Sequence, residues 1–344
     1  MNPTNTEGHR RTYAVTYDLS SLMQAFRHST IGVPAEGDPI YRRFERRLFR
    51  IIKRHLPDIK VHSIRMSEQR CLAWNEVWKS RKETDHYAVI STRHEISDET
   101  ERASRRIRGE KHVLNVNRLF GPDGNMLGYG PRPGFEPLDI QFSSIAKKIA
   151  DRPVILVEDG SVTGGTLLFI LDRLKTLGIE VIMIVIGFCC IEAEAAIRQS
   201  FRNELVIVND LGLIVDWIPD HDLVPFVPNC GRVLGKENAG AFTSVFANGG
   251  VTYAYPYILP FGKMQKWASL PEGGALAVSK LSLDFGIKLW DAVGKLNGKE
   301  IRVGDLTGIC PRISIPIEIG NHHEIPHFDL PVTEFLARMR QKLK

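Results

Sequence analysis

The middle of the chain alternates between apolar strands and amphipathic helices, and this alternation restricts the fold more than any other feature of the sequence. Two apolar runs, Val154–Val157 and Val181–Phe188, are typical of strands buried on both faces. A helical pattern over Gly165–Leu177 separates them, and the alternation continues through Glu192–Phe201, Leu205–Val208 and Leu213–Trp217. Strands that alternate with helices of this length indicate βαβ units. We therefore expect an α/β fold with a parallel sheet and flanking helices.

The flanks of this core differ from it in pattern, and they predict three parts for the 344-residue chain. We expect a basic helical extension over residues 1–84, the α/β core over 85–235 and a C-terminal α+β extension over 236–344. The last part contains turns, short strands and two expected helices, Gly274–Phe285 and Val332–Leu343. In open parallel sheets, ligands bind beyond the carboxyl ends of the strands. Candidate site residues are therefore expected at that edge.

Positive charge gathers in the N-terminal third of the chain. Residues 1–110 hold 21 Lys and Arg against 15 Asp and Glu, whereas the rest hold 24 against 25. Asp38 and Pro39 predict the N-cap and first turn of a helix that runs to Leu56 and carries six arginines. A phosphate-rich ligand or a nucleic acid would explain this bias, and so would an ordinary solvated helix face. Both explanations stay open.

The remaining global features concern the environment of the chain. Residues 1–11 are polar, and no run reaches the roughly 18 apolar residues that a membrane span needs. The five cysteines are scattered and have no Cys-x-x-Cys spacing. We therefore expect a cytoplasmic protein that has no membrane anchor, no disulfide framework and no structural zinc site.

One segment combines an apolar strand with groups that carry chemistry: residues 154–167, with the sequence VILVEDGSVTGGTL. The strand delivers two adjacent acids, Glu158 and Asp159, and a loop of small residues then leads into a helix. At such a helix N-terminus, backbone N–H groups attract a phosphate, glycine permits its close approach and hydroxyl groups add donors. The two carboxylates can accept hydrogen bonds from a ribose diol. The alternative is a plain strand, turn and helix with two incidental acids.

This segment resembles the ribose-5-phosphate loop of the type I phosphoribosyltransferases, in which an apolar strand, two acids and three residues precede Thr-Gly-Gly-Thr. The resemblance implies a Rossmann-like core that binds 5-phosphoribosyl-1-diphosphate (PRPP). It implies that Glu158 and Asp159 are the catalytic pair and hold the ribose hydroxyls. It also implies magnesium, held mainly by the substrate, with indirect contacts from Asp159 and Asp216. The residues that it implies for the 5-phosphate are Ser161, Thr163, Gly164, Gly165 and Thr166.

The same family implies a diphosphate loop after an earlier strand. Here the expected strand Tyr87–Ser91 runs into Arg93 and His94, and Arg105 lies further along the chain. The guanidinium groups of Arg93 and Arg105 can each bind two diphosphate oxygens at once, and we expect these two residues and His94 to hold the diphosphate. A surface turn is the alternative. An expected hairpin over His112–Tyr129 occupies the position of the family's mobile lid, with an ordinary exposed hairpin as the alternative.

Two positions depart from the family pattern. Members that act on 6-oxopurines carry Asp just before the first Thr of the loop, where this chain has Val162; this disfavours hypoxanthine, guanine and xanthine as acceptors. Gly160 stands where a bulky apolar residue is common. Asp216 and Trp217, at the end of an expected sheet strand, are the candidates for the acceptor pocket. A buried tryptophan can equally belong to the core.

Three functions are compatible with these features. We expect a phosphoribosyltransferase-like enzyme that uses PRPP or a nucleoside 5-phosphate with magnesium, and that forms or breaks an N-ribosidic bond at C1 of ribose 5-phosphate. The second function is a non-catalytic PRPP or nucleotide sensor that can bind nucleic acid through the basic N-terminal third. The third is a nucleotide-binding effector of a defence system. A homodimer is compatible with each of them.

Overall fold

The computed structural model describes residues 11–80, 87–92, 111–121, 123–133, 135–236, 241–245, 251–307, 313–316 and 328–343. By its contacts the chain divides into two compact units, and both combine segments that are far apart in the sequence. The first unit comprises Met1–Ala14, Ile64–Val116 and Glu136–Trp217, and the second comprises Val15–Ser63, Asn117–Phe135 and Ile218–Lys344. The three continuous domains expected from the sequence stay a prediction.

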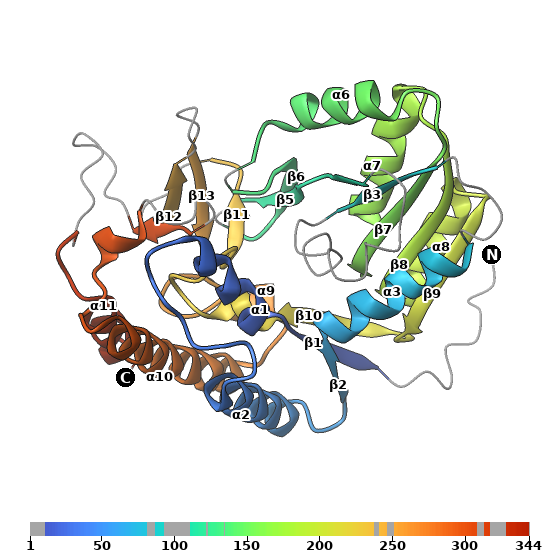
Figure 1. The fold of residues 1–344 in the computed structure, drawn as a ribbon. Coiled ribbons are helices and arrows are strands. Elements are labelled where there is room, and N and C mark those ends of the chain that lie inside the picture. Colours follow the sequence, from blue (N-terminus) through green and yellow to red (C-terminus); the bar gives the residue numbers. More distant parts are fainter. Residues whose placement is uncertain are drawn as a thin grey trace. The chain divides into compact units, whose positions relative to one another are not determined.

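The first unit is built around a five-stranded parallel sheet with the strand order β4-β3-β7-β8-β9 (Figure 1). The strands are β3 (Ala88–Ser91), β4 (Lys111–Val113), β7 (Val154–Ser161), β8 (Val181–Cys189) and β9 (Glu204–Asp210). The accompanying helices are α3 (Met66–Ser80), α6 (Leu138–Ile149), α7 (Gly165–Thr176) and α8 (Ile191–Ser200). This architecture confirms the expected α/β class, with a parallel sheet and flanking helices.

Helix α3 covers one face of this sheet. Its buried residues Trp74 and Val77 share a hydrophobic cluster with Ile155 and Val157 of β7. Because successive side chains of a strand leave opposite faces, the odd-numbered residues of β7 belong to the α3 face. By the same alternation, Asp159 belongs to the α3 face and Glu158 to the opposite face.

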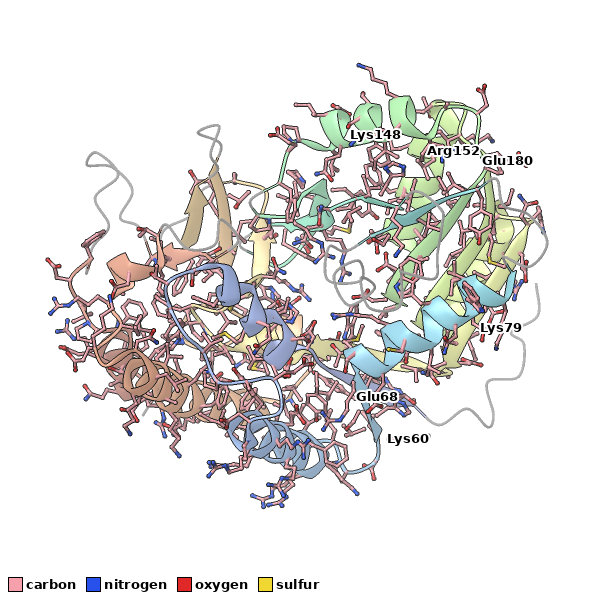
Figure 2. All side chains as sticks on the ribbon, in the orientation of Figure 1. Lys60, Glu68, Lys79, Lys148, Arg152 and Glu180 are labelled. Carbon is pink, nitrogen blue, oxygen red and sulfur yellow. The ribbon has the colours of Figure 1, made fainter. Side chains whose placement is uncertain are left out.

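The two ends of the sheet differ in polarity. At the amino-terminal end, Lys148, Arg152 and Glu180 lie near the starts of β7 and β8 (Figure 2). The backbone N–H of Val154 donates to the carbonyl of Glu180 there, at 2.8 Å. The candidate residues Glu158 to Thr166 lie at the opposite, carboxyl end of β7, where ligands of open parallel sheets bind.

The second unit contains a six-stranded sheet with the order β14-β12-β13-β11-β5-β6. Its strands are β5 (Val116–Phe120), β6 (Met126–Pro131), β11 (Arg232–Leu234), β12 (Phe242–Val245), β13 (Val251–Tyr255) and β14 (Ile315–Pro316). Its helices are α1 (Leu19–Met23), α2 (Pro39–His55), α9 (Met264–Trp267), α10 (Glu272–Asn297) and α11 (Val332–Gln341), with 3₁₀ turns at Gln24–His28, Asp220–Leu223 and Val303–Leu306. A smaller sheet has the order β10-β1-β2, with β1 (Thr12–Tyr17), β2 (Lys60–Arg65) and β10 (Ile214–Pro219).

Helix α2 forms as the sequence predicts. The Asp38 side chain accepts a hydrogen bond from the backbone N–H of Ile40 at 2.8 Å, as an N-cap does. Phe44, Leu48 and Ile52 are buried on one side of the helix, and Phe44 stacks on Phe285 of α10. Among the described residues, none of the helices combines the length and the apolar character needed to cross a bilayer.

Several expected elements differ from the structure. The strand expected to begin at His112 is divided between two sheets: β4 joins the parallel sheet and β5 the six-stranded one. The break lies at Leu114 and Asn115, because the N–H of Leu114 donates to the Ser91 carbonyl (2.8 Å) and that of Asn115 to Gln141 Oε1 (2.8 Å). The expected helix at Gly274 extends much further, as α10. A helix expected over residues 97–109 lies outside the described residues.

Candidate functional site

The carboxyl end of β7 brings the acids and the small-residue loop to one edge of the parallel sheet. The strand continues further than the sequence predicts, because Gly160 and Ser161 pair with Phe188 and Cys189 of β8. Glu158 and Asp159 are therefore strand residues rather than the first residues of a loop. Both are buried, with 7% and 4% of their surface exposed. Burial of two adjacent carboxyl groups is unfavourable unless donors or a ligand compensate for it.

Consecutive positions in a strand give the two acids different surroundings. Asp159 shares the α3 face with Ile155 and Val157, whereas Glu158 leaves from the opposite face. The backbone N–H of Asp159 donates to Glu158 Oε1 at 3.1 Å, which holds the Glu158 carboxylate close to the main chain. The two carboxylates are thus not equivalent partners of a single diol.

The loop after β7 ends in a helix N-terminus that requires a glycine. Gly164 is the N-cap of α7 and has φ of +75°, a left-handed conformation that other residues adopt at a cost. A Cβ at this position would lie 3.3 Å from the carbonyl oxygen of Ala193 and 3.4 Å from Ile197 of α8. The chain therefore needs Gly164 for its own backbone and packing, independently of any ligand.

The first N–H groups of α7 are those that an anion would use. The first helical hydrogen bond runs from the N–H of Leu168 to the Gly164 carbonyl (2.9 Å), so the N–H groups of Gly165, Thr166 and Leu167 precede the ladder. Thr163 Oγ1 accepts from the N–H of Gly165 at a long 3.4 Å. This weak bond can give way to a phosphate oxygen, which is a stronger acceptor.

Cysteines at the end of β8 support the loop rather than react. The thiol of Cys190 donates to the Val162 carbonyl at 2.7 Å. Burial raises the pKa of Cys190 to about 11 and the pKa of Cys189 to about 12. Both groups therefore remain neutral thiols at physiological pH, which agrees with the inert role expected for buried cysteines.

Gly160 is explained by an aromatic pair. A Cβ added at Gly160 would overlap the ring of Phe188, the residue that lies opposite it in β8. Phe188 in turn meets Trp217 edge to face, with ring centroids 5.0 Å apart at 84°. Phe188 thus fills the volume that a bulky residue at position 160 would occupy. The same contact brings Trp217 to the side of β7 on which Gly160 lies.

The candidates for the acceptor pocket lie in a different sheet from the one expected. Asp216 and Trp217 lie in β10, which pairs with β1 and does not belong to the parallel sheet, so the prediction of a strand end in that sheet is wrong. Asp216 Oδ1 accepts from the N–H of Trp217 at 2.8 Å. Arg93, His94 and Arg105, expected to hold the diphosphate, lie outside the described residues.

The predicted hairpin exists, but not as a separate two-stranded lid. Its turn is closed by the N–H of Gly121, which donates to the Asn125 carbonyl at 2.8 Å, and Gly124 has φ of +88°. Strand β5 lies between β6 and β11, and the N–H of Gly235 donates to the Phe120 carbonyl at 3.0 Å. Because β5 is an inner strand of a six-stranded sheet, it cannot move as a free hairpin does.

A glutamine that sequence reasoning missed joins the strand ends on the α3 face. Gln69 is buried, donates its side-chain amide to the Gly187 carbonyl and accepts from the side chain of Asn209. It thereby links α3 to β8 and β9 beside the carboxyl edge. The signal was available in the sequence, since Gln69 and Arg70 fall at the helical positions that continue the buried stripe of α3.

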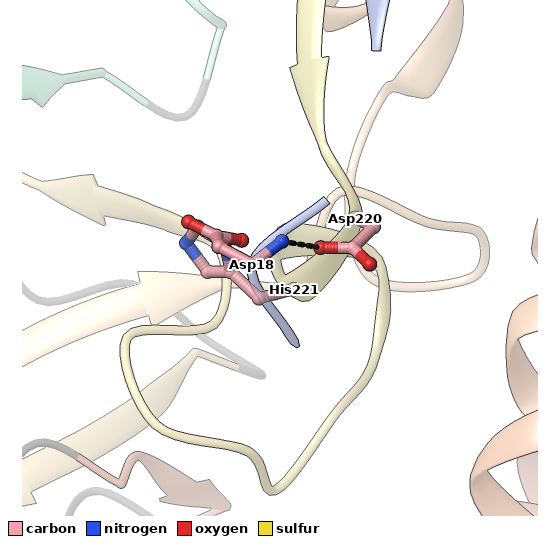
Figure 3. Close-up of side chains that lie close together, drawn as sticks. All are labelled: Asp18, Asp220 and His221. Carbon is pink, nitrogen blue, oxygen red and sulfur yellow. Dashed lines mark hydrogen bonds and ion pairs between the residues drawn. The ribbon is translucent and has the colours of Figure 1, made fainter. Parts of the chain in front are cut away.

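A second polar cluster, also missed, lies in the second unit (Figure 3). Asp18, Asp220 and His221 place one ligand atom each within 4.8 Å of one another. All three are at most 2% exposed. Asp220 Oδ1 accepts from the N–H groups of Asp18 and Leu19 (3.0 Å each), and His221 Nδ1 lies 2.5 Å from Asp18 Oδ1.

These contacts explain the cluster without a metal ion. The Asp220 carboxyl group serves the N-terminal N–H groups of α1, as a capping residue does. His221 is tied to Asp18, and its Nε2 lies 3.3 Å from Asp222 Oδ1. Magnesium usually retains several waters and prefers oxygen ligands, so a buried cluster with an imidazole suits it poorly. The cluster of Asp18, Asp220 and His221 therefore connects the start of α1 to the turn after β10.

Comparison with known proteins returns phosphoribosyltransferases. No family model and no curated protein matches the chain. Among solved structures, it is similar to a purine phosphoribosyltransferase from Pyrococcus horikoshii, with 16% identity over 43% of this chain and 87% of that one and a TM-score of 0.27. It is also similar to adenine phosphoribosyltransferase from Trypanosoma brucei (10% identity, 53% and 87% coverage, TM-score 0.31). For orotate phosphoribosyltransferase from Mycobacterium tuberculosis, identity is 13%, coverage 54% and 93%, and the TM-score 0.26.

The identities and the TM-scores of these three structures are low. All three structures are named as phosphoribosyltransferases. The chain resembles the type I phosphoribosyltransferases in the segment 154–167, which forms β7, the loop after it and the N-terminus of α7.

Proposed function

We propose that this chain is a phosphoribosyltransferase-like enzyme that binds PRPP or a nucleoside 5-phosphate and forms or breaks the N-ribosidic bond at C1. The observation that carries the proposal is the meeting of two buried carboxylates with the N-terminus of α7 at one edge of a parallel sheet. In such a substrate the diol and the 5-phosphate lie at opposite ends of one ribose. The segment from Glu158 to Thr166 offers acceptors for the diol and donors for the phosphate in that order.

The 5-phosphate is assigned to the start of α7. Three backbone N–H groups precede the helical ladder there, and the hydroxyls of Thr163 and Thr166 add donors. Ser161, at the last position of β7, supplies a third hydroxyl. The helix dipole favours a dianion at this end. Because the loop contains no cation, main-chain donors rather than ion pairs are the basis of this assignment.

The sugar and the reaction are assigned to Glu158 and Asp159. In the forward direction a nitrogen of the acceptor attacks C1 of PRPP. The C1–O bond to the diphosphate breaks, and its electron pair leaves with the diphosphate. The acceptor nitrogen then releases its proton to the departing diphosphate or to solvent. Positive charge develops on the ribosyl group during this step, and a carboxylate held near the sugar stabilises it.

The donor set of this edge fits magnesium. Carboxylate and hydroxyl oxygens are the ligands that this cation prefers, and the nearby thiols of Cys189 and Cys190 are protonated. Asp159 is the proposed indirect contact, whereas Asp216 belongs to a different sheet. When bound with the substrate, magnesium would neutralise charge on the diphosphate leaving group.

The other parts of the substrate are assigned by sequence order. Arg93, His94 and Arg105 are proposed for the diphosphate. Trp217 is proposed as a stacking face for the acceptor, since Phe188 connects it to the side of β7 that carries Glu158. Val162, in place of an acid, disfavours 6-oxopurines as acceptors.

The experiment is a screen for diphosphate release from PRPP and magnesium with a panel of nucleobases, combined with calorimetry of PRPP binding. Binding with base-dependent diphosphate release is the expected result. Binding without release for any acceptor would indicate the sensor instead. Thr166→Val removes a proposed donor, and Thr176→Val, at the other end of α7, is its control because the Thr176 hydroxyl donates within the helix, to the Asp172 carbonyl. Equal PRPP affinity in both variants would show that the phosphate lies elsewhere.

A further inference from the structure

A groove lined by exposed cations lies in the second unit, on α2. This groove of about 390 Å³ runs between α2 and α10. Its lining contains five cations and no carboxylate, namely Arg43, Arg46, Arg47, Arg50 and Lys288. All five side chains are exposed. In Figure 2, nitrogen-tipped side chains gather on the outer side of α2. We refer to this surface as the arginine groove.

The spacing of the four arginines places them along one side of α2. Positions 43, 46, 47 and 50 follow the i, i+3, i+4, i+7 pattern, so they share one side of the helix. From Arg43 to Arg50 the row extends about 10 Å along the axis, at 1.5 Å per residue. Like charges at these spacings repel one another, and this arrangement destabilises the helix unless an anion is bound.

In the part of the chain that the structure describes, none of the five cations of the groove forms an ion pair. Arg43 and Arg46 use Nε to donate to the backbone carbonyls of Pro39 and Arg42, at 3.3 Å each. These bonds anchor the side chains along the helix and occupy only one of the guanidinium N–H groups in each. The only acid in α2, Glu45, is buried on the other side.

The apolar side of α2 is not available for insertion into a membrane surface. A helix that enters a bilayer interface must expose its apolar face. Here Phe44, Leu48 and Ile52 are buried, and the ring of Phe44 stacks on Phe285 at 4.2 Å. Those two rings line the groove together with the cations. What remains for a partner is a row of guanidinium groups.

We propose that the arginine groove binds a nucleic acid strand through its phosphates. Guanidinium groups bind phosphate oxygens in pairs, and arginine is preferred to lysine where such recognition matters. Phosphates follow one another at about 3.4 Å of rise along each strand of a duplex, so about 10 Å of helix faces about three of them. A regular row of cations matches a regular row of anions. This contact is a function separate from the PRPP site.

The test is binding of a fluorescent oligonucleotide of about 20 nucleotides, measured by anisotropy with the full chain. Single-stranded RNA, single-stranded DNA and duplex are compared between about 50 and 200 mM salt. The variant changes Arg43, Arg46, Arg47 and Arg50 together to Gln, which keeps helix propensity. The control changes four exposed cations of the first unit to Gln: Lys147, Lys148, Lys175 and Arg202. The two variants lose the same net charge.

We expect the groove variant to bind at least tenfold more weakly and the control to stay within about twofold of the natural chain. The slope of log K against log salt should fall by about 3 in the groove variant, since each phosphate contact contributes about 0.7–0.9. Equal losses in both variants, or no binding by the natural chain at low salt, would overturn the proposal. So would equal affinity for inorganic triphosphate, which indicates a small ligand, or for polyglutamate, which indicates an acidic protein. Melting curves confirm that the variants are folded.

Discussion

The ring of Phe188 occupies the space that a side chain at position 160 would need. The two residues lie opposite each other in β7 and β8, and the ring is fixed from its other side by Trp217. Phe188 cannot simply turn away, because it is fully buried. The glycine at the edge of the proposed ribose site is therefore one half of a packing pair, and its partner lies on the neighbouring strand.

This pairing predicts a compensating double change. Gly160→Ala should lower the free energy of unfolding by about 1–3 kcal/mol, the usual cost of overpacking a core. Adding Phe188→Leu should recover part of that loss, because the smaller side chain leaves room for the new methyl group. Urea unfolding measures both effects. Gly37→Ala is the control, since a Cβ there would meet nothing within 4 Å. If the loss in free energy of unfolding of the double variant equals the sum of the losses of the two single variants, the pairing is contradicted.

The backbone of the phosphate loop provides a second prediction. Gly164→Ala should lower the free energy of unfolding by about 1–2 kcal/mol without any ligand, because alanine resists the left-handed conformation. Gly164→Asn should lose less, since asparagine tolerates that conformation. Thermal melts of the ligand-free proteins measure this. An equal loss in both variants would show that crowding against Ala193, rather than backbone conformation, decides the cost. Because Gly164 variants lose stability without any ligand, a loss of PRPP binding in such a variant does not by itself show that Gly164 contacts the phosphate.

Local patterns in the sequence were sufficient to predict α2, β7 and the start of α7. Asp38 and Pro39 mark the start of α2 because an N-cap and a first-turn proline are local signals, and Phe44 and Leu48 then follow the helical period. Likewise the apolar run at Val154 identifies β7, and the helix at Gly165 begins where it was expected. These features need no knowledge of the rest of the chain.

Features that depend on distant partners could not be predicted in this way. The division between β4 and β5 depends on Gln141, which accepts the N–H of Asn115 from another element. The continuation of β7 through Gly160 depends on how far β8 extends beside it. Because β7 continues, Glu158 and Asp159 leave opposite faces of the strand. The sequence alone showed only that the two acids are adjacent. The polar links made by Gln69 and Asp220 are equally long-range.

The buried carboxyl group of Asp220 predicts a pH-dependent effect on stability. Burial, and then the neighbouring Asp18 carboxyl group, raise the pKa of Asp220 well above its usual value. A raised pKa contributes stability that is fully present below the unfolded pKa of about 4, and that is lost as the pH rises through the folded pKa. Asparagine keeps an acceptor oxygen and stays neutral. Asp220→Asn should therefore become more stable relative to the natural chain as the pH rises from 4.5 to 7.5.

Two comparisons make this test specific. Asp220→Ala removes the acceptor for the N–H groups of Asp18 and Leu19 and should cost about 1–3 kcal/mol at either pH. Asp58→Asn changes an exposed acid and should show little pH dependence. Urea unfolding at the two pH values gives the differences. If Asp220→Asn is as damaging as Asp220→Ala throughout, the carboxylate itself is required and the ionised form is the native one.

The arginines of α2 should not contribute to the PRPP site. Helix α2 belongs to the second unit, whereas β7 and α7 belong to the first. Changing Arg42, Arg46 and Arg50 together to Glu should leave PRPP affinity within about twofold, because the groups proposed to hold the ribose and the 5-phosphate all belong to the first unit. Calorimetry with PRPP and magnesium measures this. A large loss of affinity in a folded protein would place this helix in the active site.

The last prediction separates the roles of the two buried acids. Glu158 and Asp159 leave opposite faces of β7, and Asp159 shares its face with the packed residues of α3. We therefore expect Glu158→Gln to weaken binding of PRPP and magnesium by about 1.5–3 kcal/mol, the usual contribution of a hydrogen bond to a charged group. Its stability should stay the same or rise, as when a strained functional group is relaxed.

Asp159→Asn should have the larger effect on stability, because it alters a buried carboxyl group on the face of β7 that packs against α3. Melting curves with and without PRPP and magnesium measure stability and binding in the same samples. Glu180→Gln, at the amino-terminal end of the same sheet, is the control for loss of one negative charge (Figure 2). If Glu158→Gln melts much lower while its PRPP-induced shift survives, Glu158 is structural and the ribose lies elsewhere. If both acid variants lose the shift equally and keep their stability, the two carboxylates act together on the sugar despite leaving opposite faces.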